Sequence, residues 1–424
     1  MNKRVNIRYG EDTLSVDIPE ESFLYTIGPR DVAPIKNDEE YIRKCLRNPI
    51  SCPALSDQLK PDMKVVILVD DLTRPTPQDR ILPILLDGLN SIGIGDSGIS
   101  AIIALGTHRY MTDKEITRHC GKEATDRIEI VNHEWKNKDN FVNLGSTKKG
   151  TPVIINRRVA EADYIIGIGS IVPHEQAGFS GGAKIVQPGI CSWETTGCTH
   201  MMAANESDYL GIAGKMTNDT RLEMEEVGRK VGLDFIINVV VDQYKNLVEV
   251  VAGDPVDAQR KGIDSSSEIY IRKIHEQADI VVLSSYPAEI DYWQGAKSLS
   301  FAQRGAKEGG TVILVGPFPE GVASPHPELE KHAMRPDREI RRLIKDGEIK
   351  DLVCAAALIL HALILKRVQV ICVSKGMTIE QKKNLGFKHA ESISHALEMA
   401  FEDQGKDAKV GVIDYGGDVL PRVK

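Results

Sequence analysis

The chain has 424 residues, of which 42% are hydrophobic and 27% are charged, and its formal net charge is −8 at pH 7. This length predicts two domains with ample cores, and the composition is that of a folded globular protein rather than a disordered or fibrous one. The negative net charge argues against nucleic acid as a partner, because proteins that bind a phosphate backbone carry basic surfaces.

The sequence shows no feature of a secreted or membrane protein. Charges are spread through residues 1–20, which therefore differ from a signal or transit peptide. The longest apolar stretch, residues 352–365, is too short to cross a bilayer and is expected to form a buried helix. The seven cysteines show no disulfide spacing. We therefore expect a cytoplasmic protein with reduced thiols and no membrane partner.

Short apolar runs rich in β-branched residues alternate with helical stretches along the chain. Strands are expected within residues 64–71, 100–108, 162–174, 278–287, 310–319, 368–374 and 409–414, and helices over residues 77–90, 112–120, 220–231 and 300–308. Continuous apolar strands separated by helices are typical of parallel sheets that are covered on both faces. The predicted fold class is α/β, with mostly parallel sheets flanked by helices.

One segment departs from this alternation. Residues 235–255 indicate two strands around a turn at residues 244–246, which is the pattern of a hairpin. A new strand-loop-helix series begins near residue 277. We therefore predict an N-terminal domain over residues 1–276 and a C-terminal domain over residues 277–424, with the active site in the cleft between them.

Polar residues gather where the predicted strands end. Residues 71–77, 106–109, 173–184 and 286–297 each follow an apolar run. In open α/β sheets, ligands bind at the carboxyl ends of the strands. These four segments are therefore the candidates for a binding site.

The densest of these segments is residues 174–184, with the sequence HEQAGFSGGAK. Its glycines allow the backbone to approach a ligand closely, which suits a phosphate group. It is not a Walker loop, because Ala183 separates the last glycine from Lys184 and Ile185 stands where a hydroxyl is required. A structural turn with a surface lysine is the alternative.

Three histidines, His108, His174 and His200, lie in or just after these loops. A single loop histidine is more often a hydrogen-bonded structural residue, but three of them near a glycine-rich loop favour roles as acid, base or metal ligand. Cys191 and Cys198 could bind zinc together with His200, although the paired spacing of a zinc knuckle is missing.

Two further segments carry groups suited to anions. Asp71, Thr73 and Arg74 precede a helix that prolines help to start, and an arginine fork at a helix N-terminus can hold a phosphate or carboxylate. Gln294 and Lys297 could hold a substrate carboxylate. The alternative for the first segment is an ordinary helix N-terminus capped by Asp71. The alternative for the second segment is a solvent-exposed helix start. A NAD-binding site is disfavoured, since the chain lacks a Gly-x-Gly-x-x-Gly turn between a strand and a helix.

Five motifs occur in order along the chain: Asp-x-Thr-Arg-Pro, Gly-Thr-His-Arg, Pro-His-x-x-Ala-Gly-Phe-Ser-Gly-Gly-Ala-Lys, Thr-His and Gln-x-x-Lys. As a set they resemble the motifs of the nickel-pincer lactate racemase family. The resemblance runs from the N-terminal strands to Lys297 and more loosely through the C-terminal domain. It implies a racemase or epimerase of small 2-hydroxy acids that depends on proteins which make and deliver its cofactor.

The resemblance also implies the cofactor, Ni(II)-pyridinium-3,5-bisthiocarboxylate mononucleotide, and a role for each matching residue. Lys184 would bond covalently to this nucleotide, and His200 would ligate the nickel beside soft sulfur donors. His108 and His174 would be the catalytic acid-base pair. The cofactor would lie against Asp71, Leu72, Thr73, Arg74 and Pro188, and the substrate against Arg74, Gln176, Trp293, Gln294 and Lys297.

The implied chemistry explains why two histidines are expected. Removal of the C2 proton from a hydroxy acid is unfavourable, because the adjacent carboxylate is already charged. Transfer of a hydride to the cofactor avoids this problem, and inversion then requires one histidine near the hydroxyl position on each face.

Two positions depart from the family pattern. Trp293 stands where lactate racemases are expected to have a tyrosine, and Gln176 stands two residues after His174, where an apolar residue is expected, with Glu175 between them. A polar pair suits a longer or hydroxylated side chain, such as that of malate or an aldonate, better than a methyl group. A non-catalytic carrier of the nickel cofactor, which would need Lys184 and His200 alone, is a further alternative.

Overall fold

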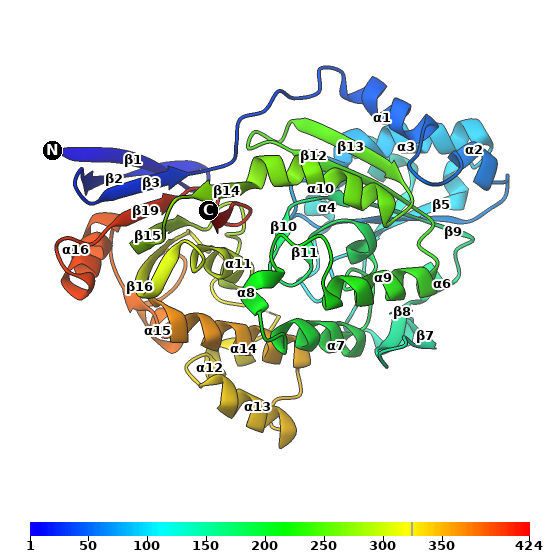
Figure 1. Cartoon of the computed structure of the whole chain (residues 1–424). Coiled ribbons are helices and arrows are strands. Elements are labelled where there is room, and N and C mark those ends of the chain that lie inside the picture. The colour runs from blue at the N-terminus through cyan, green and yellow to red at the C-terminus, as the bar shows by residue number, and fades with distance from the viewer. Residues whose placement is uncertain (324) are drawn as a thin grey trace.

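The apolar runs of the sequence form two six-stranded sheets, one in each lobe of the molecule (Figure 1). The computed structural model describes residues 1–323 and 325–424. The sheet of the N-terminal lobe has the strand order β13 (Leu247–Gly253), β12 (Phe235–Val241), β9 (Tyr164–Ser170), β4 (Val65–Val69), β5 (Ile99–Ile103) and β6 (Glu129–Asn132). Every residue of β4, β9 and β12 is buried, which is why these strands are continuously apolar.

The strands of this sheet are parallel except for β12 and β13, which pair antiparallel. These two strands form the predicted hairpin, and Lys245 lies in its turn with a φ of 64°. The helices of this lobe are α1 (Asp38–Arg47), α2 (Leu55–Gln58), α3 (Gln78–Ile92), α4 (Asp113–Cys120), α5 (Lys122–Arg127), α6 (Arg157–Ala160), α7 (Trp193–Ala204), α8 (Tyr209–Ile212), α9 (Asp219–Val231) and α10 (Asp257–Tyr270).

Helices cover both faces of the N-terminal sheet. The apolar sides of α1, α3, α4 and α5 pack in one core cluster, and those of α7, α9 and α10 pack in another. The helices predicted at residues 77–90, 112–120 and 220–231 are confirmed as α3, α4 and α9. Thr112 and Glu115 form a capping box at the start of α4, and Asn218 caps α9.

The sheet of the C-terminal lobe is parallel throughout. Its strand order is β18 (Lys388–His389), β17 (Gln369–Val373), β16 (Ala306–Val315), β15 (Ala278–Ser284), β19 (Val410–Ile413) and β3 (Phe23–Ile27). The edge strand β3 comes from the start of the chain. The division at residues 276 and 277 stays a prediction, but a linear division does not allow for this N-terminal strand, which pairs with β19.

The helices of the C-terminal lobe are α11 (Tyr292–Ala302), α12 (Glu328–His332), α13 (Asp337–Lys345), α14 (Leu352–Arg367), α15 (Ile379–Asn384) and α16 (Ile393–Gln404). The helix predicted at residues 300–308 is wrong. Asp291 caps a helix that starts earlier, and the chain from Ala306 pairs with β15. Strand pairing therefore outweighs the local helical pattern. The apolar segment 352–365 is helical and largely buried, as predicted.

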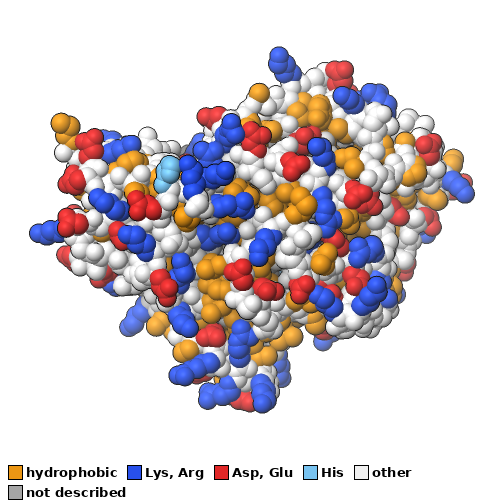
Figure 2. All heavy atoms as spheres, in the orientation of Figure 1, with side chains coloured by type: hydrophobic (Ala, Val, Ile, Leu, Met, Phe, Trp, Pro, Cys, Tyr) orange, Lys and Arg blue, Asp and Glu red, His pale blue; other side chains and the backbone are white. Residues whose placement is uncertain are grey.

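Four two-stranded sheets complete the fold: β1 (Asn2–Tyr9) with β2 (Asp12–Pro19), β7 (Phe141–Ser146) with β8 (Pro152–Asn156), β10 (Pro173–His174) with β11 (Gly178–Phe179), and β14 (Ile271–Ile274) with β20 (Leu420–Val423). The β1–β2 hairpin and α16 pack on one face of the C-terminal sheet. On the face drawn in Figure 2, acidic and basic side chains are interspersed, and hydrophobic side chains show between them. Within the described ranges, no helix has both the length and the apolar character needed to span a bilayer.

Candidate active site

A pocket lies between the two lobes, where the loops after β4, β5 and β9 meet α11 and α14. Most of the residues predicted to form the site line this pocket: Asp71, Arg74, His108, His174, Gln176, Lys184, Pro188, His200, Trp293, Gln294 and Lys297. Leu72 and Thr73 line a smaller adjoining recess instead. The pocket therefore brings together groups from both lobes at the carboxyl edge of the N-terminal sheet.

His108 is held by partners at both ring nitrogens. Its Nδ1 lies 2.6 Å from Oδ2 of Asp71, and its Nε2 lies 3.0 Å from the amide nitrogen of Gln294. Because a carboxylate accepts and an amide nitrogen donates, the ring carries its proton on Nδ1 and presents a lone pair at Nε2. Burial alone would raise the pKa of Asp71, but His108 and Arg74 outweigh this effect and hold the carboxyl well below its usual range.

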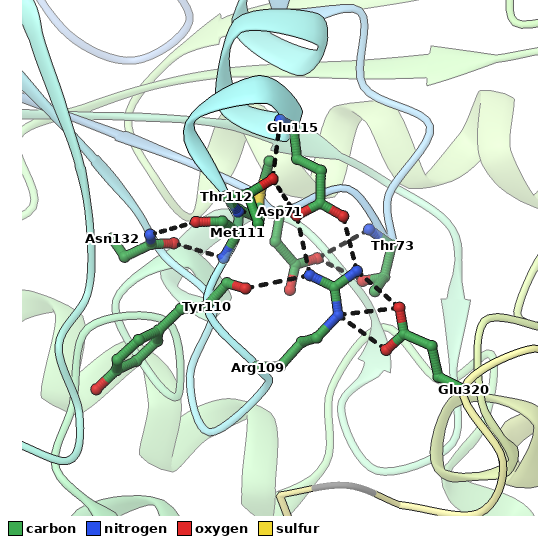
Figure 3. Close-up of polar contacts among 9 residues, drawn as sticks. All are labelled: Asp71, Thr73, Arg109, Tyr110, Met111, Thr112, Glu115, Asn132 and Glu320. Carbon is green, nitrogen blue, oxygen red and sulfur yellow. Dashed lines mark hydrogen bonds and ion pairs between the residues drawn. The ribbon is translucent and has the colours of Figure 1, made fainter.

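The residue after His108 links the two lobes. The Arg109 guanidinium donates to Glu115 at 2.8 and 3.0 Å and to Glu320 of the C-terminal lobe at 2.7 and 2.8 Å (Figure 3). These two carboxylates raise the pKa of Arg109 above its ordinary value. The ion pairs are partly exposed, so they contribute more to geometry than to stability. They tie the backbone beside His108 to the C-terminal lobe.

The glycine-rich loop is fastened by three side chains that lie far from it in the sequence. The Arg221 guanidinium is buried and donates to backbone carbonyls of the loop, those of Ala177, Phe179 and Gly181. Asn238 accepts from the backbone of Gly182 at 2.7 Å, and Gln259 donates to the carbonyl of Ser180 at 3.1 Å. Burial lowers the pKa of Arg221 to about 10, and the guanidinium stays charged at neutral pH.

A glycine in this loop is required by space. Gly178 has a φ of 76°, and a Cβ built on it would lie 1.9 Å from the carbonyl oxygen of Lys215. A side chain would therefore displace the loop, because real Cβ atoms do not approach backbone so closely. The loop carries His174 at one end and Lys184 at the other, so its close packing sets the distance between two candidate functional groups.

The hydrogen bonds of His174 indicate a different tautomer from that of His108. Its Nδ1 accepts hydrogen bonds from the backbone N–H groups of Gln176 at 3.2 Å and Ala177 at 3.3 Å. Burial lowers the pKa of His174 well below its usual value, and the nearby cations Lys184 and Lys297 lower it further. A neutral ring whose Nδ1 accepts carries its proton on Nε2. His174 therefore presents a donor to the pocket, whereas His108 presents an acceptor.

Lys184 lies in the 3₁₀ turn η3 (Gly182–Ile185) that ends the glycine-rich loop. Burial lowers its pKa well below the value of a free lysine, and the cationic side chains of Arg74, Arg221 and Lys297 add to the shift. This shift favours the neutral form of the amine, which is the nucleophilic one. A surface lysine, the alternative considered from the sequence, does not describe this residue.

His200 lies on α7 and points one ring nitrogen at its own helix. Its Nδ1 lies 2.9 Å from the carbonyl oxygen of Thr196, which it can only donate to, so the lone pair of Nε2 is left for a ligand. Burial lowers the pKa of His200 to about 4. Among the residues that the structure describes, no three His, Cys, Asp or Glu side chains gather to hold a metal. Burial raises the pKa of Cys191, which keeps this thiol protonated, unlike a zinc ligand.

The cations of the pocket differ in their partners. Lys297 is 6% exposed, and its Nζ lies 3.0 Å from Oδ1 of Asp418. Burial lowers the pKa of Lys297, and Asp418 opposes this shift. For the Arg74 guanidinium, no hydrogen bond or ion pair to another described side chain is present. Lys297 is thus fixed in place, while Arg74 keeps its donors for a ligand.

A buried histidine, His326, connects the loop before His108 to α14. His326 is 1% exposed; its Nδ1 lies 2.8 Å from Oδ2 of Asp351 and its Nε2 lies 3.2 Å from the hydroxyl of Thr107. The ring of Trp293 stacks on His326, with centroids 4.0 Å apart and planes inclined by 16°. Asp351 also caps α14. This chain of contacts sets the orientation of Trp293 and joins the loop before His108 to the C-terminal lobe.

Comparison of the chain with known protein families and curated sequences shows the family to which it belongs. Two protein-family models match the chain: the lactate racemase N-terminal domain over residues 9–211 and the lactate racemase C-terminal domain over residues 273–420. A lactate racemase of Lactiplantibacillus plantarum is 30% identical over 424 residues, which cover 98% of this chain and 99% of the relative. The chain belongs to the lactate racemase family. The resemblance predicted from the motifs is therefore confirmed.

A second lactate racemase and two solved structures are also similar to this chain. A lactate racemase of Thermoanaerobacterium thermosaccharolyticum is 28% identical over 425 residues, 99% of each chain. The structure of the lactate racemase apoprotein from the same organism has a TM-score of 0.89 and 27% identity, with 99% of this chain and all of that one covered. The crystal structure of a Thermotoga maritima protein shares the fold, with a TM-score of 0.71 and 21% identity. The match covers 91% of this chain and 98% of that one.

Proposed function

We propose that this member of the lactate racemase family is an isomerase that racemises or epimerises small 2-hydroxy acids. The observation that supports this most directly is the opposed state of two histidines in one pocket: a lone pair at Nε2 of His108 and a donor at Nε2 of His174. Inversion at a carbon that bears a hydroxyl requires a group of this kind near each of the two hydroxyl positions. The lactate racemases among its relatives support the same reaction class.

We further propose that the cofactor is Ni(II)-pyridinium-3,5-bisthiocarboxylate mononucleotide, and the residues of the pocket fit this group. Lys184 offers an amine whose lowered pKa favours the nucleophilic form, and His200 offers a single imidazole to a metal whose other ligands the nucleotide would bring. Two buried hydroxyls that line the pocket, those of Ser170 and Thr196, have no hydrogen-bond partner among the described residues. A polar ligand would supply the partners that these oxygens lack.

When bound, the nickel nucleotide supplies a hydride acceptor for the hydrogen on C2 of the substrate. His108 accepts the hydroxyl proton at Nε2, and the carboxylate of Asp71 stabilises the imidazolium that results. His174 donates a hydrogen bond from Nε2 on the other side. Formation of the opposite enantiomer requires a proton at the oxygen on the side of His174, and release of the proton held by His108 keeps the overall proton count unchanged.

The remaining residues hold the substrate anion and the nucleotide in this proposal. The free guanidinium of Arg74, the Lys297 ammonium and the Gln294 amide provide donors for a carboxylate. Asp71 and Pro188 line the pocket on the cofactor side, together with Arg74. Leu72 and Thr73 act indirectly, since the Thr73 hydroxyl donates to Asp71 and both residues face the adjoining recess.

Intact-protein mass spectrometry with nickel analysis tests the cofactor proposal. The protein is expressed with and without the proteins that synthesise the pincer nucleotide, which are its proposed maturation partners. We expect a mononucleotide adduct on Lys184 and about one nickel per chain, with nickel lost in His200→Ala. A protein that carries neither adduct nor nickel under loading conditions refutes the proposal.

The same material distinguishes an enzyme from a non-catalytic carrier of the nickel cofactor. A carrier needs Lys184 and His200 but has no use for His108 or His174. We therefore expect His108→Ala to retain the adduct and nickel while racemisation of 2-hydroxy acids falls to background. Unchanged nickel content with no racemisation by the unmodified holoprotein favours the carrier.

A further inference from the structure

One wall of the pocket is apolar and comes from α14. Ala357, Leu360 and Ile364 lie on one face of this helix and line the pocket, since residues three, four and seven apart share a helical face. Leu329 of α12 and Ala296 of α11 extend the same wall. The sequence assigned no function to this segment, because a helix that is apolar all round predicts only burial.

This wall stands beside the proposed position of the substrate. α14 packs along α7, which carries His200, and also contacts α11, which carries Gln294 and Lys297. A 2-hydroxy acid whose carboxylate is held by Gln294 and Lys297 of α11 therefore has α14 within reach of the rest of the molecule. The substituent on C2 is the part that remains to be placed.

The polar groups of this wall are already paired within the protein. The Tyr292 hydroxyl donates to Nδ1 of His361 at 2.8 Å, and Nε2 of His361 donates to the carbonyl of Leu385 at 2.9 Å. A hydroxylated side chain placed here would lose its water and find no partner, which is costly. An apolar side chain loses nothing and gains contact with Leu360 and Ile364.

We infer that α14 forms the specificity wall of the site and that the preferred substrate is a 2-hydroxy acid with an apolar, branched or aromatic side chain larger than methyl. This inference rests on the proposed function. Ala357 is central to it, because a small residue in the middle of the wall leaves room that a methyl group does not fill. The wall thus selects by volume and by the absence of free polar groups.

The polar pair of the glycine-rich loop is a weaker basis for substrate choice. Burial raises the pKa of the Glu175 carboxyl, while Lys297 and Ser300 oppose this shift. Glu175 therefore lies near polar groups of the protein itself. The expectation of a hydroxylated substrate, drawn from Glu175 and Gln176 in the sequence, becomes the alternative outcome of the test below.

The test compares racemisation by the holoenzyme of lactate, malate, 2-hydroxy-4-methylpentanoate and 3-phenyllactate. Since each buried methylene favours binding by about fourfold, we expect kcat/KM for one of the two bulky acids to exceed that for lactate and malate by about tenfold or more. Ala357→Phe fills the wall and should shift the ratio of bulky acid to lactate about tenfold towards lactate. Ala160→Phe, the same change at an exposed position, should leave the ratio unchanged.

Calorimetric titration of the holoenzyme with the same four racemic acids gives a second readout. We expect the same order of Kd values, with the preference for a bulky acid weakened in Ala357→Phe. A kcat/KM for lactate or malate that equals or exceeds the values for both bulky acids overturns the inference and leaves the racemase proposal intact. Binding in the expected order without any racemisation overturns the proposed function instead, and an unchanged ratio in Ala357→Phe excludes α14 as the wall.

Discussion

The replacement Arg221→Lys tests whether a buried guanidinium holds the glycine-rich loop in place. Arg221 donates to three loop carbonyls, at 3.3 Å for Ala177, at 3.1 Å for Gly181, and to Phe179. A lysine keeps the positive charge but cannot span three separate carbonyls, so about two hydrogen bonds are lost. At about 1 to 1.5 kcal/mol each, the free energy that holds the loop closed should fall by roughly 2–3 kcal/mol.

Hydrogen exchange measures this change directly, because it reports local opening rather than global unfolding. For peptides that cover residues 178–184 in the apoprotein, we expect exchange to accelerate roughly 30- to 150-fold, at 1.4 kcal/mol per factor of ten. Arg229→Lys is the matched control, since Arg229 lies exposed on the same helix. Unchanged protection of this segment in a folded Arg221→Lys protein would refute the role assigned to the guanidinium.

Three other predictions concern the same pocket and its loop. Asp71→Asn should retain the cofactor adduct but lower kcat of the holoenzyme by roughly 10³- to 10⁴-fold, because the tautomer of His108 is no longer fixed; a loss below tenfold contradicts this role. Lys184→Met should raise the thermal midpoint of the apoprotein at pH 7. Burial lowers the pKa of Lys184 in the folded chain, so the unfolded chain binds this proton more readily than the folded chain does, and the advantage of the variant should shrink as the pH approaches 10. An equal increase in the thermal midpoint at pH 7 and pH 10 would show that the lowered pKa of Lys184 is not the cause of the stabilisation. Gly178→Ala should destabilise the protein by about 3 kcal/mol or more, whereas Gly150→Ala, with a φ of 88° and open space around it, should cost about 1 kcal/mol; equal thermal midpoints for the two variants would contradict the steric argument.

Much of the fold could be predicted from local pattern, and the exceptions have a physical cause. β4, β9 and β12 are buried on both faces, so their apolar runs are conspicuous in the sequence. β3 is an edge strand with mostly half-buried residues, and its pairing with β19 joins opposite ends of the chain. A long-range pairing of this kind leaves no periodic signal within a window of sequence.

The candidate catalytic and cofactor-binding residues could be predicted from the sequence, because they lie in loops that follow predicted strands. The residues that hold those loops in place could not be predicted. His108, His174 and Lys184 follow predicted strands, and the expectation that they share one edge needed only the α/β topology. Arg221 and His326 gave no such signal, because an arginine in a helix or a histidine after a proline is usually exposed or structural. Their roles arise from distant contacts with the glycine-rich loop, Thr107 and Asp351.

The pairing of β3 with β19 also has a consequence for synthesis on the ribosome. The third strand to emerge, β3, belongs to a sheet in which its partner, β19, is translated almost last. The N-terminal lobe can fold while residues 2–27 have no sheet to pack against. During this time the apolar β1–β2 hairpin and the unpaired edge of β3 are exposed to water. Closure of the C-terminal lobe is then the final event of folding, and the nascent chain needs protection at its beginning until its end has been made.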